Sequence, residues 1–222
     1  MRTLLHHPLS AASRMVRIVL TEKNLEFEAS IEKPWERREE FLAINPAGDV
    51  PVLLETDGGV VCGGMAICEY LDEVYGEPSL IGYSASERAE VRRLTAWFME
   101  KFQREVTENL VGEKLIKRVQ GQGHPFASAI RAGVANIHYH LVYLTWLSDR
   151  RRWLAGTAFS LADIAAAAQL STVDYSGDVP WDEHPEAKTW YARMKSRPSL
   201  RPVLADVLPG IPPPAHYSNL DF

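Results

Sequence analysis

The chain has 222 residues, 46% of them hydrophobic and 24% charged, which predicts one large folded domain or two small ones. Its net charge of -5, with acidic and basic side chains interleaved, argues against a surface for nucleic acid or an anionic membrane. Two cysteines are too few for a disulfide scaffold or a four-cysteine zinc site, which indicates a reducing compartment. No apolar run approaches the ~20 residues of a membrane span, and the first residues do not resemble a signal peptide, so we expect a cytoplasmic protein.

Residues 1–80 change their hydrophobic period repeatedly, which predicts a small domain of mixed α/β structure. Residues 3–7 favour a strand, residues 10–23 carry apolar side chains at helical spacing, and residues 27–31 alternate as a second strand. A polar loop follows, and then a hairpin with Asp57-Gly58-Gly59 as its turn, and a further helix. The order βαβ, loop, ββα predicts a mixed sheet with helices packed on it.

Residues 87–205 keep helical spacing, which predicts a second, all-α domain joined to the first by a linker at residues 81–86. Two long helices separated by a Gly- and Pro-containing turn are expected to pack on each other. The motif Ser160-Leu161-Ala162-Asp163 starts a helix whose Ala165–Ala168 run is small and apolar on all sides, and we expect this helix to be central and buried. Residues 206–222 continue no helical pattern and are predicted to form an extended, Pro-rich tail.

The remaining His and Cys residues do not predict a metal site. His138 and His140 are two apart on a helix, so their side chains point to different faces and cannot share a metal. Cys68 falls inside a helix and is expected in the core, whereas Cys62 ends a strand and is either a small buried side chain or a reactive thiol. We therefore expect no bound metal.

Five motifs that occur in order along the chain carry a family resemblance. They are Ser10-x-x-Ser13-x-x-Val16-Arg17-Ile18, Asn45-Pro46-Ala47-Gly48-Asp49-Val50-Pro51-Val52-Leu53, Ala66-Ile67-x-x-Tyr70-Leu71, Ser160-Leu161-Ala162-Asp163, and Pro185 to Arg197-Pro198. With them, residues 1 to about 203 resemble the soluble glutathione S-transferases. The resemblance implies a thioredoxin-like N-terminal domain, a helical C-terminal domain, a homodimer and a cis Val50-Pro51 peptide bond.

The same resemblance locates a glutathione site. Enzymes of the family activate the glutathione thiol with a Ser, Tyr or Cys at the start of the first helix, and the matching residue is Ser10. Ser10 is also an ordinary helix N-cap, and capping is the favoured interpretation. The family's Glu-Ser pair, which holds the γ-glutamyl end of glutathione, is replaced by Gly63-Gly64. Because hydrogen bonds to charged groups contribute about 1.5–3 kcal/mol each, we expect a degenerate site formed by Ser10, Val50, Pro51, Gly63 and Gly64.

Two segments are candidates for binding a protein partner. The tail contains three consecutive prolines, which favour a stiff segment, followed by an apolar and acidic terminus. Such a terminus is a recurrent form of docking motif. The alternative is that the tail folds back on the body, as chain termini commonly do. Trp35, in the charged loop before the hairpin, either packs on the domain or anchors a partner. The predicted contact residues are Trp35, Tyr217, Leu220, Asp221 and Phe222.

Gly63-Gly64 and the tail together resemble a bacterial cell-division branch of this family, whose members bind filaments of the tubulin-like GTPase FtsZ. That resemblance implies a non-enzymatic homodimer at the division site that binds no cofactor and promotes curved or bundled FtsZ filaments. Because a two-fold dimer presents each surface twice, it can cross-link or bend a polymer. Two alternatives remain open. One is a glutathione S-transferase or glutathione-dependent isomerase that uses Ser10 and glutathione; the other is a binding module that offers the same tail to a different protein.

Overall fold

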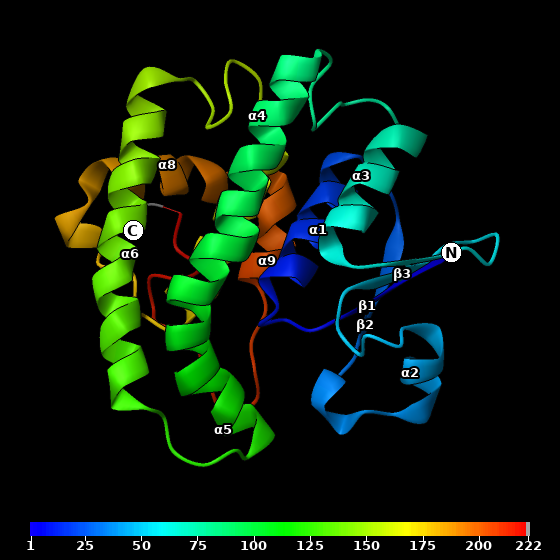
Figure 1. The fold of residues 1–222 in the computed structure, drawn as a ribbon, viewed down its shortest axis with the longest axis horizontal. Helices are drawn as coiled ribbons and strands as arrows, with labels where there is room; N and C mark the ends of the chain where they lie inside the picture. Colours follow the sequence, from blue (N-terminus) through cyan, green and yellow to red (C-terminus); the bar gives the residue numbers. More distant parts are fainter. Residues whose placement is uncertain (221–222) are drawn as a thin grey trace.

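The computed structural model describes residues 1–220 and places a sheet-containing N-terminal part beside a bundle of helices (Figure 1). The N-terminal elements are β1 (Arg2–His6), α1 (Ala11–Glu22), β2 (Phe27–Ile31), η1 (Pro34–Glu36), α2 (Glu39–Ile44), β3 (Val52–Leu54), β4 (Val60–Cys62) and α3 (Gly64–Val74). The helical part contains α4 (Ala85–Ala96), η2 (Trp97–Ile116), α5 (Lys117–Gln120), α6 (Ala127–Arg150), α7 (Leu161–Tyr175), η3 (Trp181–Glu183), α8 (Pro185–Lys195), η4 (Pro198–Leu200) and α9 (Arg201–Leu204). The predicted fold class, α/β followed by all-α, is confirmed.

The sheet has the strand order β2-β1-β3-β4. β1 and β2 run parallel, and α1 makes the crossover that parallel neighbours require, whereas β3 is antiparallel to both β1 and β4. In the register of β1 with β3, Leu4 pairs with Leu53, and both side chains are fully buried. The short β3–β4 hairpin follows the Val50-Pro51 bond, which is cis as expected.

Helix α1 lies between the two parts of the molecule. Ser10 caps its N-terminus, and Asn24 just beyond its C-terminus adopts a left-handed conformation with a φ of +53°, as the sequence predicted. The helix packs against α3 on the N-terminal side and against α7 of the bundle. Because two layers cover it, most of its residues are buried, including Arg14 and Arg17.

Two predicted boundaries differ from the structure. The loop expected before the hairpin contains η1 and the short helix α2, whose Phe41 is buried. The linker expected at residues 81–86 is shortened because α4 already begins at Ala85. There the hydroxyl of Ser84 accepts from the Glu87 amide while the Glu87 carboxylate accepts from the Ser84 amide, a reciprocal cap that starts the helix early.

The first long helix of the bundle comprises α4, η2 and α5 without interruption, and η2 is wound as a π-helix. At its end the Lys117 amide donates to the Gly112 carbonyl five residues back. A helix with this bonding has more residues per turn than the α-helix, so side chains four apart stay on one face for longer. The buried residues Phe98, Phe102, Val106 and Leu110 follow that spacing.

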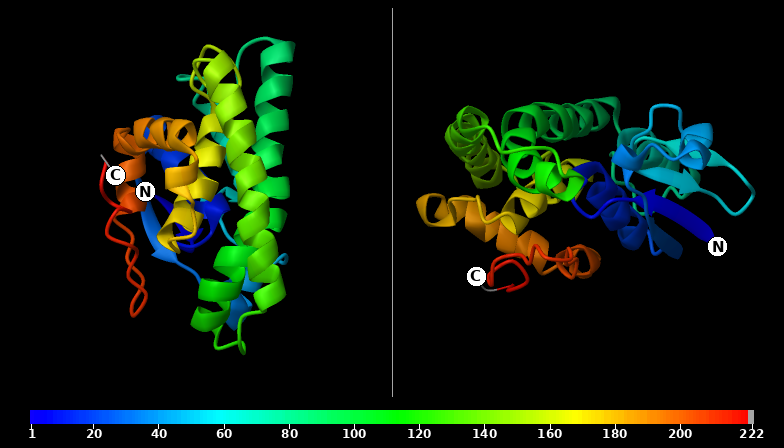
Figure 2. Two further views of the ribbon diagram at one scale, coloured as in Figure 1. Left: turned by 90° about the vertical axis from the view of Figure 1, so that its left-hand side faces the viewer. Right: turned by 90° about the horizontal axis from the view of Figure 1, so that it is seen from below.

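The second long helix, α6, packs along η2, and the two lie side by side in Figures 1 and 2. Gly133 of α6 lies directly against η2. A Cβ atom at this position would lie 2.7 Å from Leu110 Cγ, so the absence of a side chain allows the helices to approach.

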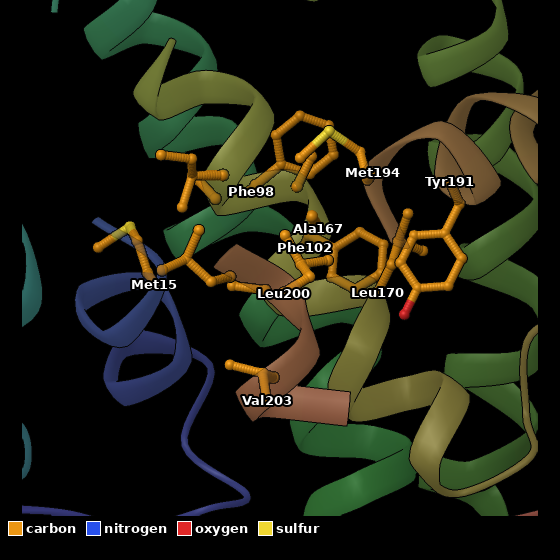
Figure 3. Close-up of a cluster of buried hydrophobic side chains, with 14 of the residues drawn as sticks. Met15, Phe98, Phe102, Ala167, Leu170, Tyr191, Met194, Leu200 and Val203 are labelled. Carbon is orange, nitrogen blue, oxygen red and sulfur yellow. The ribbon is translucent and has the colours of Figure 1, made fainter. Parts of the chain in front are cut away.

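Helix α7 is the centre of the hydrophobic core, and all its residues are buried. Ser160 and Asp163 form the predicted capping box at its start. Figure 3 shows Ala167 and Leu170 of α7 among side chains from α1, η2 and α8, among them Met15, Phe102 and Tyr191. The two parts of the molecule therefore share one continuous core.

Candidate functional site

A cleft of about 450 Å³ opens between the N-terminal part and η2. Its walls are the turn from β1 to α1, the segment around η1, Val50 and one face of η2 and α5. Of the residues predicted for a glutathione site, Ser10 and Val50 line the cleft, whereas Pro51, Gly63 and Gly64 are not among its lining residues.

Ser10 combines a structural role with a place in the cleft wall. Its Oγ accepts a hydrogen bond from the Ser13 amide at 3.2 Å, which is the capping role that we favoured. The hydroxyl hydrogen is not used by that bond and can donate to a ligand. Ser13 itself is fully buried, with its Oγ accepting from the His7 amide at 3.3 Å.

His7 and Trp35 form an aromatic pair at the cleft, with ring centroids 4.9 Å apart in edge-to-face geometry. Burial, followed by the nearby Arg14 charge, lowers the pKa of His7 to about 4, so the ring is neutral at physiological pH. Its Nδ1 accepts from the Leu9 amide at 3.3 Å, which places the proton on Nε2 and makes that nitrogen a donor. Trp35 is half-buried; it both packs on the domain and borders the cleft.

The Gly63-Gly64 pair lies at the start of α3, where its backbone geometry disfavours larger residues. Gly63 has a φ of +89°, in the region that side chains rarely adopt. A Cβ atom at position 64 would lie 3.1 Å from Ala12 Cβ and 3.2 Å from Met15 Cε. The glycines thus permit close packing of α3 on α1 and supply no side chain to hold a γ-glutamyl group.

The charge of the cleft is equally unsuited to glutathione, an anion at neutral pH. Among the described residues that line it, none is Lys or Arg, and the exposed carboxylate Glu108 is the charged member because His7 is neutral. An anion placed there would exchange water for neutral groups and one like charge. The residues present therefore do not fit tight glutathione binding. They fit a neutral, partly apolar group that accepts hydrogen bonds from His7 and Ser10.

The η2 wall of the cleft was not anticipated from the sequence. It consists of a row of neutral side chains spaced about four residues apart, Met99, Gln103, Thr107, Val111 and Ile116. Two of them belong to a network in which the Gln169 carboxamide donates to Gln103 Oε1 at 3.0 Å and accepts from Thr107 Oγ1 at 2.6 Å. The repeated spacing of four was visible in the sequence, but interpreting it requires knowing that the helix is wound more widely than usual.

The tail corrects one prediction. Instead of extending away, it folds back on the body beside α8 and α9, on the side opposite the long helices (Figure 2). Tyr217, predicted as a partner contact, is fully buried and so cannot contact a partner in this conformation. Its hydroxyl accepts from Arg14 Nη1 at 2.8 Å, and its ring packs against Tyr175. Leu220 is half-buried against the core. Asp221 and Phe222 lie outside the described residues, and for them the prediction stands as made.

Both cysteines are free thiols. Cys68 is buried, as expected, and burial raises its pKa far above the ordinary value. Cys62 is half-buried, and partial burial followed by Asp49 raises its pKa as well. A raised pKa keeps a thiol protonated, so neither side chain has the environment of a reactive thiolate.

Among residues 1–220, no helix is long and apolar enough to cross a membrane.

The comparisons with known proteins agree with this fold. Residues 9–74 match the glutathione S-transferase N-terminal domain, and residues 136–198 match the glutathione S-transferase C-terminal domain. FtsZ-localized protein A from Caulobacter vibrioides is 49% identical over 224 aligned positions, covering 100% of this chain and 98% of that protein.

Solved structures give the same result. A glutathione S-transferase from Rhodospirillum rubrum F11 superimposes with a TM-score of 0.98 at 61% identity, with both chains covered completely. FzlA from C. crescentus superimposes with a TM-score of 0.96 at 49% identity, covering 100% of this chain and 99% of that chain. Two matched domains, full-length relatives and the shared architecture show that this chain belongs to the glutathione S-transferase family.

Proposed function

We propose that this chain is a non-enzymatic family member that binds FtsZ filaments as a homodimer at the division site and promotes their curvature or bundling. The observation that carries the proposal is the full-length similarity to FtsZ-localized protein A, which extends through the tail. The cleft supports it, because its described lining residues include no Lys or Arg and the Gly63-Gly64 pair supplies no side chain, which is a poor match for glutathione. Trp35 at the cleft and Leu220, Asp221 and Phe222 at the end of the chain are the proposed contacts.

The structure decides which tail variant tests this proposal. A deletion of residues 217–222 would remove the buried Tyr217 and damage the body together with the contact. Asp221→Lys is the sharper change, because it reverses one charge at the end of the chain. Its matched control is Glu28→Lys, a charge reversal at an exposed position of the edge strand β2.

The assay is sedimentation and electron microscopy of FtsZ polymerised with GTP. We expect the unmodified protein and Glu28→Lys to co-sediment with curved or bundled filaments, and Asp221→Lys to leave them straight and unbound. If the unmodified protein neither sediments with the filaments nor changes their form, the proposed function is wrong. If Asp221→Lys binds as well as the unmodified protein, the tail is not the contact.

The homodimer of this proposal has a candidate surface on α6. Tyr139, Val142 and Trp146 are 60%, 59% and 45% exposed along one face of that helix. Contiguous exposed apolar side chains are typical of interaction sites, and a second copy of the chain would bury them. We expect Val142→Glu to convert a dimer to a monomer in analytical ultracentrifugation and to abolish bundling, since one copy presents each contact once. A monomeric unmodified protein would contradict this part of the proposal.

The alternative function is a glutathione S-transferase that uses Ser10. The specific observation in its favour is the 61% identical structure from Rhodospirillum rubrum, which is named as such an enzyme. Conjugation of glutathione to a general electrophile, reduced by Ser10→Ala, would support the enzyme. Absence of turnover in the folded protein would support the non-enzymatic proposal.

A further inference from the structure

Arg14, in the first turn of α1, is an unusual buried charge. Its side chain is fully buried, and in the described part of the chain all its hydrogen-bond partners are neutral: Pro8 O at 2.6 Å, Ser171 Oγ at 2.9 Å and the Tyr217 hydroxyl at 2.8 Å. Its Nη2 has no partner among those residues. A buried guanidinium that forms no ion pair with the residues the structure describes depends strongly on each acceptor that it retains, because water cannot replace a lost one.

One of these acceptors lies in the turn that carries part of the cleft wall. Pro8 lies in the turn between β1 and α1, flanked by His7 and Leu9, which line the cleft. The turn is closed by a hydrogen bond from the Ser10 amide to the His7 carbonyl at 3.0 Å. Arg14 Nε therefore holds the backbone of the segment that supports the His7 ring, and through it the edge-to-face contact with Trp35.

Another acceptor belongs to the tail. The Tyr217 hydroxyl accepts from Arg14 Nη1 and donates to the Val203 carbonyl at 3.3 Å. The Tyr217 and Tyr175 rings meet edge to face at 5.2 Å, and the Arg14 guanidinium lies within 6 Å of both centroids, 5.8 and 5.9 Å away. Arg14 is therefore one of the groups that hold Tyr217, and with it the tail, in place.

We propose that Arg14 is a positioning residue that couples the seat of the C-terminal tail to the wall of the cleft. Because one rigid, planar group holds the Pro8 turn and Tyr217 at once, a change at Tyr217 is transmitted to the turn that supports His7. The significance of this coupling for a partner rests on the proposed function, but the coupling itself can be measured without a partner.

The test is amide hydrogen exchange on the full chain carrying Tyr217→Phe. This change removes the hydroxyl and keeps the ring in the core. The expected result is exchange about tenfold faster at the Ser10 and Arg14 amides, since a buried donor that loses its acceptor weakens the segment by about that factor. Arg14→Lys, which keeps the charge but loses the planar fork, should speed exchange at the same amides.

Tyr175→Phe is the matched control. The Tyr175 hydroxyl also tethers the tail, accepting from the Leu208 amide at 2.8 Å and donating to the Ile211 carbonyl at 2.6 Å, but it does not bond to Arg14. We expect Tyr175→Phe to speed exchange at Leu208 and to leave Ser10 unchanged. Unchanged exchange at Ser10 and Arg14 in Tyr217→Phe, or equal changes there in both variants, would overturn the coupling.

A second readout uses FtsZ filaments. If Arg14 couples the tail to the cleft, the losses of affinity from Trp35→Ala and Asp221→Lys should be non-additive, and Tyr217→Phe should make them additive. Additive losses in the unmodified background would overturn the coupling. If FtsZ does not bind at all, the proposed function fails, and hydrogen exchange alone decides the coupling.

Discussion

The close contact between Gly133 of α6 and η2 leads to a prediction opposite to that from helix propensity. In the middle of a helix, Gly→Ala stabilises by about 1 kcal/mol. Here the new Cβ would lie 2.7 and 2.9 Å from Leu110 Cγ and Cδ2, and 3.0 Å from Asn109 Cβ. Overpacking of a core costs about 1–3 kcal/mol, and three contacts this short favour the upper end. The free energy of unfolding of Gly133→Ala should therefore fall by about 2 kcal/mol.

Urea denaturation followed by circular dichroism measures this change, and the melting temperature should fall by about 4–8 °C. Leu110 is fully buried, so Leu110→Ala alone should cost about 2–5 kcal/mol. If the clash is the cause, the double variant should be more stable than the sum of the two single losses predicts, by about 1 kcal/mol or more. A stabilised Gly133→Ala, or strict additivity, would refute the reasoning.

Two further predictions concern pH and the glycine pair. Burial is the largest cause that lowers the pKa of both His6 and His7 to about 4, whereas the unfolded chain has about 6.5. Both rings are neutral in the folded protein, so stability is fully present above pH 6.5 and is lost as the pH falls towards 4, by about 3 kcal/mol for each ring. Urea midpoints at pH 7 and pH 5 should differ accordingly, and equal midpoints would contradict the burial argument. Gly64→Ser should lower the free energy of unfolding by about 1–3 kcal/mol, because the new side chain meets Ala12 and Met15. We expect it not to create glutathione binding. A calorimetric titration that showed glutathione binding to this variant would contradict our view of the cleft.

Local signals in the sequence determined much of the fold. Ser10 and Ser160 marked the starts of two helices, and Asn24 marked the end of one, because caps are hydrogen bonds between residues close in the chain. The family motifs added the thioredoxin-like character of the N-terminal part and the cis bond at Val50-Pro51. The helix α2 and the early start of α4 were missed because their signals are short.

The character of the site and the position of the tail were decided only by tertiary structure. The cleft is formed by side chains about 100 positions apart, such as Ser10 and Gln103, and it carries no positive charge on its described lining because burial keeps His7 neutral. The composition of the terminal segment is typical of a free peptide, yet Tyr217 is buried, and its hydroxyl accepts a hydrogen bond from Arg14, 203 positions earlier. Periodicity and caps depend on neighbours in the chain, whereas the environment of a buried charge depends on every element packed around it, and no local pattern records that.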